Sequence, residues 1–287
     1  METITVPSCK GNGKSIYANY YSGIEKSKNC IIYACSMFQY PDMNSSFLEE
    51  LSKDFDVIAP HYTGHGINDQ EVDFTFDDLV DDIKSAILCA KEEYKYENII
   101  LFGFSLGGII SAIIAPEEGL PLKAIFAMEV VLAEMPETYK YVLRVPFIKS
   151  REGLLQLVGI LEKIVPARTK ISERWFRNER IASKSDLEAS ASFPFATQAY
   201  RKEFLLSFLR AKTDGIVTRG SKYPFVMIAS KSDRLMPFGY QQMVSKKIKA
   251  AEFIKLNIGG DHCSMQPHKV LEVVVPKLKK YFNQALS

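Results

Sequence analysis

Long hydrophobic runs are missing from the sequence. No uninterrupted apolar stretch among the 287 residues reaches the roughly 18 residues that a membrane-spanning helix needs, so no transmembrane segment is expected. The first residues, Met1 to Pro7, lack a basic group followed by an apolar run, which argues against a signal peptide. We therefore expect the protein to work in the cytoplasm.

Cysteine is scarce, and its spacing is irregular. The 5 cysteines are odd in number and form no CxxC pair, so we expect free thiols in a reducing compartment rather than a disulfide framework. The histidines and carboxylates form no HxxxH or His/Cys cluster, so we predict neither a metal nor another cofactor. The cysteines are Cys9, Cys30, Cys35, Cys89 and Cys263.

An excess of charge of one sign is also missing. The 36 Lys and Arg residues nearly balance the 34 Asp and Glu residues, and the formal net charge is +2. Because the chain has no basic stripe and no arginine run interleaved with aromatics, nucleic acid is not an expected partner. With 47% hydrophobic and 24% charged residues, the composition is that of an ordinary globular protein with a substantial core.

Short apolar runs alternate with amphipathic segments along most of the chain. Between residues 76 and 88, for example, apolar side chains repeat at three and four residues, which predicts a helix. Such alternation of strands and helices requires a mostly parallel sheet with helices on both faces, an α/β fold. Two further strands, 3–6 and 15–21, flank the turn signal Gly11-Asn12-Gly13 and predict a hairpin. The other predicted strands are 30–34, 56–60, 98–102, 123–128, 224–230 and 252–256, and a helix from about 268 to 284 closes the chain.

The segment from about Glu134 to Ser221 interrupts this alternation. It shows helical pattern and no strand-like run flanked by a turn, so we predict a helical cap at 134–221, inserted into an α/β core formed by residues 1–133 and 222–287. Within it, residues 153–166 are dense in aliphatic side chains. We interpret them as a helix packed on the core, with a wall of an acyl-binding tunnel or a lipid-contacting surface as the alternative.

The sequence GFSLGG at residues 103–108 lies between an apolar strand and an apolar helix. It fits the pattern G-x-S-x-G, in which the serine sits on a sharp strand-to-helix turn that raises its hydroxyl above the sheet edge. Gly103 and Gly107 are expected where any side chain collides with a neighbouring strand or helix. Ser105 is the predicted nucleophile, and the Leu106 amide at the helix start is expected to point toward the oxyanion of a tetrahedral intermediate.

A nucleophilic serine needs a base, and the base needs an acid that orients it. His262 follows the last predicted strand on a glycine-containing loop, and Asp233 follows the strand 224–230 in the sequence SKSDRLMP. Both therefore come at the carboxyl ends of strands, as Ser105 does, and open α/β sheets build their sites there. We predict Ser105, Asp233 and His262 as a catalytic triad.

Other residues compete for these roles. Glu129, just after the strand 123–128, is a rival acid, and we favour Asp233 for its S-D-x-x-x-P context. His65 is interpreted as a structural loop residue bonded to backbone, and His268 as a solvated residue at a helix start. Cys35 lies near the predicted site, but it occupies no strand-to-helix turn, so a cysteine nucleophile is disfavoured.

These features resemble the α/β-hydrolase superfamily from about residue 15 to the C-terminus. The chain order Ser, Asp, His is that of the family, and APHYTGHG at residues 59–66 is similar to the segment after the family's fourth strand. The region 200–210, the strand that follows it and the sequence SDRLMP are similar to the monoacylglycerol-lipase and lysophospholipase-like branch. The resemblance implies hydrolysis of carboxylic esters without a cofactor.

Two departures from the family pattern matter. Where the family often carries His-Gly after its third strand, this chain has Ala34-Cys35-Ser36-Met37, so the second oxyanion amide is expected from either Ser36 or Met37. His61 stands where the family usually has an acidic residue, and we interpret it as a surface loop histidine.

The expected protein is a serine hydrolase that cleaves a small-molecule ester with a hydrophobic acyl group through an acyl-enzyme on Ser105. The alternative is a thioesterase or acyltransferase acting on a CoA-bound or carrier-bound acyl chain, with an acyl carrier protein as partner. A non-catalytic binding protein with a hydrolase fold is a third possibility. It is disfavoured because such proteins commonly lose a member of the triad, and this chain keeps all three.

Overall fold

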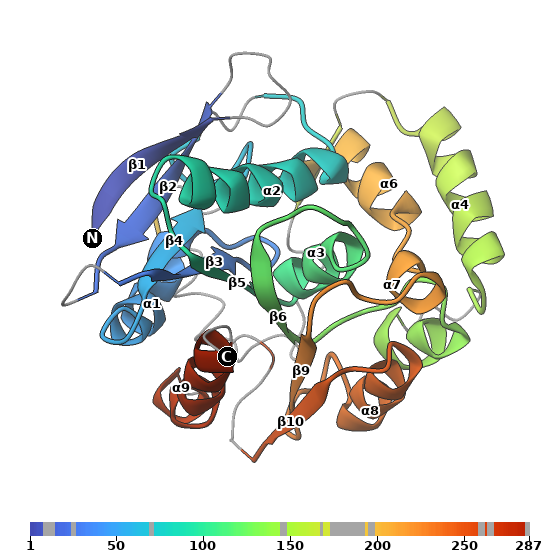
Figure 1. Cartoon of the computed structure of the whole chain (residues 1–287). Helices are drawn as coiled ribbons and strands as arrows, with labels where there is room; N and C mark the ends of the chain where they lie inside the picture. The colour runs from blue at the N-terminus through green and yellow to red at the C-terminus, as the bar shows by residue number, and fades with distance from the viewer. Residues whose placement is uncertain are drawn as a thin grey trace.

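The computed structural model describes residues 1–7, 15–23, 27–68, 72–143, 148–166, 169–172, 193–194, 199–257, 262 and 267–284. An 8-stranded sheet runs through the molecule in the strand order β1-β2-β4-β3-β5-β6-β9-β10 (Figure 1). Its strands are β1 (Glu2–Pro7), β2 (Ser15–Tyr21), β3 (Asn29–Ala34), β4 (Asp56–Pro60), β5 (Asn98–Phe104), β6 (Leu122–Met128), β9 (Phe225–Ser230) and β10 (Glu252–Leu256).

The sheet is parallel from β4 to β10 and antiparallel at its other edge. Strand β3 pairs in parallel with β4 and β5, β6 with β5 and β9, and β9 with β10. Strand β2 pairs antiparallel with β1 and β4. Every residue of β4 and β9 is buried, because helices cover both faces. The predicted mostly parallel sheet is confirmed, while the predicted turn at Gly11-Asn12-Gly13 lies outside the described residues.

Helices cover both faces of the sheet. Helices α1 and α9 lie together on one face, and α2 and α3 lie on the other (Figure 1). At the start of α2, the Thr75 and Asp78 side chains accept hydrogen bonds from each other's backbone amide, a capping box that defines where this helix begins. The elements in this group are η1 (Pro41–Asn44), α1 (Ser45–Leu51), α2 (Phe76–Glu92), α3 (Leu106–Ile114), α8 (Phe238–Lys247) and α9 (Pro267–Asn283).

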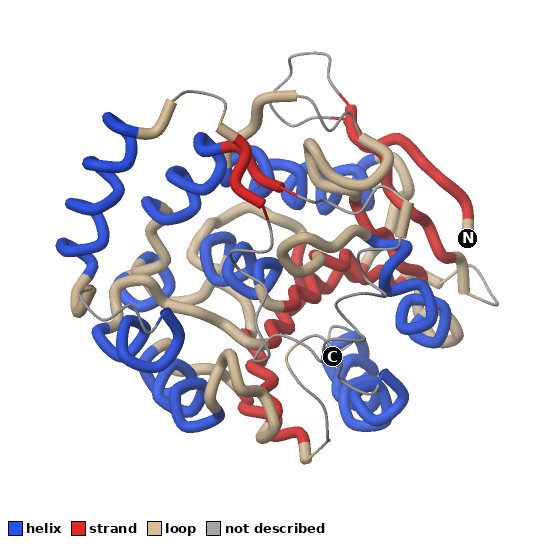
Figure 2. The backbone as a smooth tube through the Cα atoms, turned by 180° about the vertical axis from the view of Figure 1, so that it is seen from behind, coloured by secondary structure: helices blue, strands red, loops and turns tan. Residues whose placement is uncertain are grey.

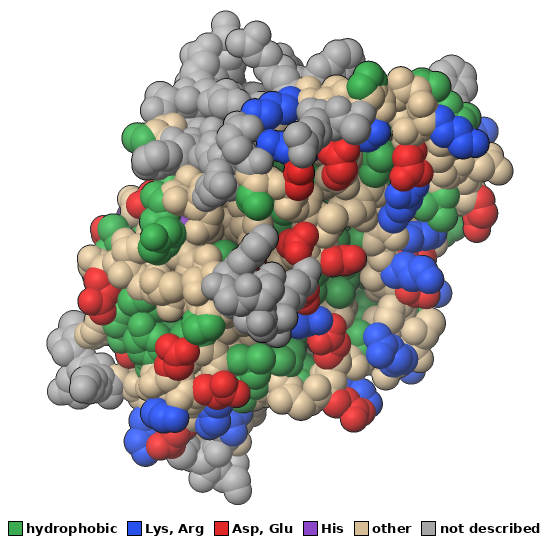
Figure 3. Space-filling view, turned by 90° about the horizontal axis from the view of Figure 1, so that it is seen from above, with side chains coloured by type: hydrophobic (Ala, Val, Ile, Leu, Met, Phe, Trp, Pro, Cys, Tyr) green, Lys and Arg blue, Asp and Glu red, His purple; other side chains and the backbone are tan. Residues whose placement is uncertain are grey.

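None of the helices in the described ranges is both long enough and apolar enough to cross a membrane. On the face seen from above, Lys and Arg side chains lie beside Asp and Glu side chains (Figure 3). This mixture reflects the near balance of acidic and basic residues in the chain.

Residues 134–221, which we call the inserted segment, connect β6 to β9. Its helix α4 lies outermost, and α6 lies between α4 and α2 (Figures 1 and 2). The expectation that this segment holds no strand is wrong, because β7 and β8 pair antiparallel with Ile171 opposite Tyr200. Each has only 3 residues, too few to leave an alternating pattern in the sequence. The elements here are η2 (Thr138–Leu143), α4 (Arg151–Ile164), β7 (Lys170–Ser172), β8 (Ala199–Arg201), α6 (Lys202–Arg210) and α7 (Gly215–Thr218).

Helix α4 packs on a small hydrophobic cluster of its own. Its inner face buries Leu154 and Val158 against Leu206 of α6, together with Tyr139 and Ile148. The helix therefore packs along one stripe, but against the inserted segment itself rather than on the main core expected for residues 153–166. Its outer face leaves aliphatic side chains in solvent, namely Leu155, Leu157, Ile160 and Ile164.

Candidate active site

Ser105 stands on a sharp turn between β5 and α3, with a backbone φ of 53° that a side-chain-bearing residue rarely adopts. The glycines beside it have no room for a side chain. A Cβ on Gly103 meets the Gly107 carbonyl oxygen at 2.2 Å, and a Cβ on Gly107 meets the Ala34 carbonyl oxygen at 2.1 Å. The close approach of β5, α3 and the end of β3 thus requires both glycines and holds the serine in its strained conformation.

The structure brings the three predicted triad residues together. His262 Nε2 lies 2.8 Å from Ser105 Oγ, and His262 Nδ1 lies 2.6 Å from Asp233 Oδ2. All three side chains are buried, with Asp233 after β9 and Ser105 after β5 at the same edge of the sheet. The loop 258–261 that precedes His262 lies outside the described residues.

The hydrogen bonds around Asp233 define the tautomer of the histidine. Its Oδ1 accepts from the amides of Leu235 and Met236, at 2.8 and 2.7 Å, which leaves Oδ2 for the imidazole. Because a carboxylate only accepts, His262 Nδ1 carries the proton and Nε2 accepts from the Ser105 hydroxyl. The ring of Phe104 lies 5.4 Å from the imidazole and packs against it. This geometry lets His262 take the serine proton.

The loop after β3 lies directly against the serine turn. The Gly107 amide donates to the Cys35 carbonyl at 3.0 Å, and the Tyr62 hydroxyl donates to the same oxygen at 3.0 Å. Ser36 and Met37, the two expected sources of the second oxyanion amide, follow Cys35 immediately. The Leu106 amide opens α3, where helix amides have no partner within the helix. The Gly107 hydrogen bond to Cys35 thus brings the loop that carries Ser36 and Met37 next to the turn that carries Ser105.

Glu129, the rival acid, is also in this region but does not contact the histidine in the described structure. It follows β6 with a φ of 61° and is fully buried, and its Oε1 accepts from the Ser230 amide at 2.9 Å. Burial, and then the negative charge of Asp233, raise the pKa of Glu129 well above its usual value. The imidazole pairs with Asp233 rather than with Glu129.

The remaining histidines have structural surroundings. The interpretation of His61 as a surface residue is wrong, because its side chain is fully buried and its Nε2 lies 3.1 Å from Asn19 Oδ1. Burial lowers the pKa of His61 to about 4. His65 is buried as well, and its Nδ1 bonds to the Thr63 carbonyl at 3.0 Å, as expected of a structural residue. His268 is exposed at the start of α9, as predicted.

The described cysteines are free and buried, which fits the expectation of free thiols. Burial raises the pKa of the Cys35 thiol far above its usual value, so this cysteine is a poor nucleophile. Cys9 and Cys263 lie outside the described residues. The free and buried cysteines are Cys30, Cys35 and Cys89.

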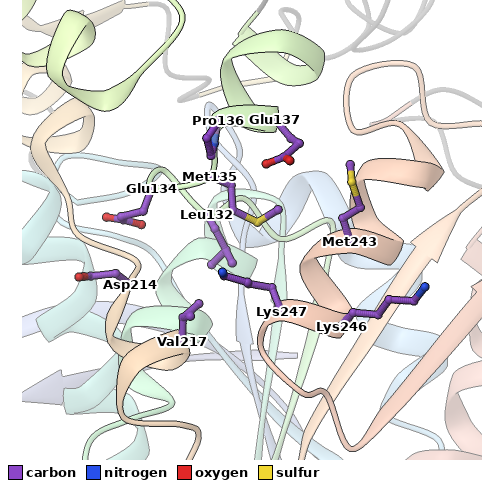
Figure 4. A pocket seen from close by; sticks show the side chains of 10 residues that line it. All are labelled: Leu132, Glu134, Met135, Pro136, Glu137, Asp214, Val217, Met243, Lys246 and Lys247. Atoms are coloured by element: carbon purple, nitrogen blue, oxygen red, sulfur yellow. The ribbon is translucent and has the colours of Figure 1, made fainter.

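Among the described residues, the inserted segment helps to line a small and a larger cavity. A small apolar one of about 60 Å³ is lined by Ile109, one helical turn beyond Ser105, and by Leu154 and Phe208 of the inserted segment. A larger depression of about 690 Å³ opens between the residues after β6, α7 and α8 (Figure 4). None of the three triad residues lines the larger one, so we do not place the reaction there. Its charged lining residues are Glu134, Glu137, Asp214, Lys246 and Lys247.

One residue in contact with the site is not marked by any pattern in the sequence. Tyr200, in β8 of the inserted segment, accepts a hydrogen bond from the Phe38 amide in the loop after β3. The two residues are 162 positions apart, and no local pattern marks such a contact.

Residues 37–265 match the alpha/beta hydrolase fold family, and the chain belongs to this family. Family membership and the hydrogen-bonded serine at the strand-to-helix turn make the protein an enzyme of the serine-hydrolase class. By sequence comparison, no curated protein matches the chain.

Several solved structures share the fold. The monoacylglycerol lipase of Paleococcus ferrophilus is 16% identical over 93% of this chain and 99% of its own, with a TM-score of 0.69. A thermostable carboxyl esterase of Bacillus coagulans is 15% identical over 99% and 98%, with a TM-score of 0.72. A soluble variant of monoglyceride lipase from Saccharomyces cerevisiae is 12% identical over 98% and 96%, with a TM-score of 0.67. The expected resemblance to this branch is thus confirmed at the level of the fold.

Proposed function

We propose that the protein hydrolyses carboxylic esters with a hydrophobic acyl group, with Ser105, His262 and Asp233 as its catalytic triad. The observation that carries the proposal is the unbroken hydrogen-bonded chain from Ser105 Oγ through His262 to Asp233. The solved structures of similar fold include a monoacylglycerol lipase and a carboxyl esterase, which supports an ester as the substrate.

In the proposed reaction, Ser105 Oγ attacks the ester carbonyl carbon while His262 Nε2 takes the hydroxyl proton. Asp233 stabilises the resulting imidazolium, and the amides of Leu106 and of Ser36 or Met37 hold the oxyanion. The imidazolium then protonates the leaving alcohol, which leaves the acyl group on Ser105. Water, deprotonated by His262 Nε2, then attacks the acyl carbon. The bond from that carbon to Ser105 Oγ breaks, and the imidazolium returns its proton to Oγ, which releases the acid and restores the free serine.

The acyl group is proposed to enter the small apolar cavity beside α3. Ile109 contributes to its wall one turn after the nucleophile, while Leu154 and Phe208 close it from the inserted segment. Leu157 is 37% exposed, so the acyl-contacting face of α4 is the one that carries Leu154 rather than Leu157. In this proposal residues 134–221 act as a cap over the core formed by 1–133 and 222–287.

A thioester carried by CoA or by an acyl carrier protein is the second substrate class to test, because the same triad chemistry cleaves it. Turnover of a panel of oxygen esters and matched thioesters, from acetyl to dodecanoyl, separates the two classes. We expect higher kcat/KM for the oxygen esters.

The buried free thiols of the described residues support a reducing compartment, and we propose the cytoplasm.

A fluorophosphonate probe tests the central claim directly. It should label Ser105 covalently near neutral pH, because only an activated serine is nucleophilic there. Labelling should vanish in Ser105→Ala while the melting temperature stays close to that of the wild type. Intact-mass and peptide analysis showing no adduct, or an adduct on another residue, would remove Ser105 from its role.

A further inference from the structure

Tyr200 contacts the loop after β3 through a hydrogen bond and through its ring. The Phe38 amide donates to Tyr200 Oη at 2.8 Å, and the two rings lie 4.5 Å apart. Tyr200 is 1% exposed and also packs on Phe204, at a ring distance of 4.4 Å. The inserted segment therefore supplies a buried hydrogen-bond acceptor to the loop that carries Ser36 and Met37.

The backbone that Tyr200 holds is strained. The Gln39 amide donates to the Ser36 carbonyl at 3.3 Å and closes a four-residue turn over Met37 and Phe38. Phe38, the third residue of this turn, has a φ of 62°, a conformation that favours glycine at that position. A phenylalanine stays in such a conformation only where surrounding structure holds it. The hydrogen bond to Tyr200 holds the Met37–Phe38 peptide in this orientation.

His65 determines which way the Tyr200 hydroxyl points. Its Nε2 lies 2.8 Å from Tyr200 Oη, while its Nδ1 faces the Thr63 carbonyl, which can only accept. Nδ1 therefore carries the proton in the neutral ring, and Nε2 accepts from the tyrosine hydroxyl. Burial lowers the pKa of His65 to about 4, so this tautomer persists near neutral pH. The hydroxyl donates to His65 and keeps a lone pair directed at the Phe38 amide.

Thr63 is itself anchored to a helix that covers the sheet. The Thr63 amide and hydroxyl donate to the Asp82 carboxylate of α2, at 2.6 and 3.1 Å. A continuous line of hydrogen bonds thus runs from α2 through His65 and Tyr200 to the Phe38 amide. The loop after β3 is positioned by the body of the enzyme, although it holds a conformation that its own sequence disfavours.

We propose that Tyr200 is a positioning residue for the oxyanion-binding amides, with its hydroxyl oriented by His65 and directed at the Phe38 peptide. This inference rests on the proposed function, because the turn that Tyr200 holds carries both expected sources of the second oxyanion donor, Ser36 and Met37. Tyr200 does not touch the substrate. It acts through the backbone, by holding the turn that carries the amides expected to bind the developing oxyanion.

The test compares Tyr200→Phe with Tyr223→Phe. Tyr223 also accepts a backbone hydrogen bond, from the Leu120 amide at 3.1 Å, but just before β6 begins and away from the carboxyl ends of the strands. Tyr200→Phe should lower kcat on a butyrate ester by about 10- to 100-fold with little change in KM, less than outright loss of an oxyanion donor costs. It should slow fluorophosphonate labelling of Ser105 by a similar factor. Tyr223→Phe should leave both rates within about twofold.

Hydrogen exchange gives a readout that needs no turnover. The Phe38 amide should exchange faster in Tyr200→Phe than in the wild type or in Tyr223→Phe, because its acceptor is gone. If the melting temperature of Tyr200→Phe falls far below that of Tyr223→Phe, His65→Gln carries the same test, since it disturbs the orientation of a hydroxyl that remains present.

Failure of the proposed function and failure of the inference about Tyr200 give different results. If the proposed function is wrong, the wild type itself neither cleaves esters nor reacts with the probe. If the inference about Tyr200 is wrong, the wild type is active, Tyr200→Phe matches it in kcat and labelling rate, and Phe38 exchange is unchanged. A loss in Tyr200→Phe that only tracks its melting temperature, with the same loss in Tyr223→Phe, also overturns the inference.

Discussion

The sheet with its helices and the outermost helix of the inserted segment, α4, are packed differently, although other parts of the inserted segment, such as Tyr200 and Phe204, belong to the main core. One continuous hydrophobic core runs from β1 to α9 and buries residues of every sheet strand. Helix α4 rests instead on a separate cluster of 5 buried residues and leaves Ile160 and Ile164 exposed by 56% and 68%. Regions with few buried contacts open at lower free energy than a continuous core does. The proposed chemistry and the proposed acyl contacts therefore depend on parts of the molecule that differ in packing.

The largest expected effect falls on the well-packed side. Asp233→Asn should lower kcat by roughly 10³–10⁴, because the imidazole loses the negative charge that orients it and stabilises its protonated form. Glu129→Gln is the matched control, since Glu129 is buried nearby and is not bonded to the histidine. It should cost far less. Steady-state kinetics of both variants decide, and a larger loss in Glu129→Gln would move the acid to the end of β6.

A smaller effect, limited to esters of longer acyl chains, is expected from a substitution in helix α4 of the inserted segment. Leu154→Trp fills the apolar cavity beside Ile109 and should lower kcat/KM for medium and long acyl esters by about 10- to 200-fold, the range for one changed pocket contact. Acetyl esters should be spared, because they do not reach the cavity. Ile164→Trp, on the exposed face of the same helix, should change neither.

The matching measurement is kcat/KM across acyl lengths together with a melting curve for each variant. A loss in Leu154→Trp that is equal for acetyl and long-chain esters and follows its melting temperature contradicts the cavity as an acyl site. Such a result would also contradict the proposal that the core carries the triad while the inserted segment contacts the acyl group.

The smallest expected effect is on how the stability of the folded protein depends on pH, through the buried His61. Burial holds the pKa of His61 at about 4 in the folded protein, whereas an unfolded histidine titrates near 6.5. The unfolded state therefore binds the proton first, and stability present above pH 6.5 is lost as the pH falls toward 4. At pH 5 this amounts to about 2 kcal/mol for His61.

Two other buried groups titrate in the same range and oppose each other. His65 acts in the same sense as His61, with a pKa of about 4, whereas burial raises the pKa of Asp82 to about 7 and adds stability as the pH falls. Urea unfolding of the wild type and of His61→Gln at pH 7 and pH 5 isolates His61. The loss between the two pH values should be about 2 kcal/mol smaller in the variant. An equal loss in both proteins places His61 outside this effect.

Many of the sheet strands and the turn at Ser105 could be predicted because their sequence signals are local. The strands around residues 98–104 and 225–230 are apolar runs in the sequence, and both are confirmed. The GFSLGG motif predicted the turn at Ser105. A Cβ at Gly103 collides with the nearby Gly107 carbonyl, while a Cβ at Gly107 collides with the Ala34 carbonyl at the end of β3. Asp233 and His262 were predicted from their places after strands, and the structure brings both to Ser105.

The features that the sequence did not predict depend on short elements or on contacts between distant segments. The 3-residue strands β7 and β8 are too short for periodicity, and the burial of His61 depends on Asn19, 42 residues earlier. The density of aliphatic residues at 153–166 did not show which stripe of α4 faces a neighbour: Leu154 and Val158 are buried, whereas Leu157 is exposed.

The sequence by itself determined the order of strands and helices, the serine turn and the strand ends at which the triad residues stand. These follow from periodicity and steric limits among residues close in the chain. Tertiary structure alone decided that His61 is buried, which stripe of α4 is buried, and that Tyr200 contacts the turn at Phe38. Those outcomes depend on distances between segments far apart in the chain, and such distances exist only once the sheet and the inserted segment have packed together.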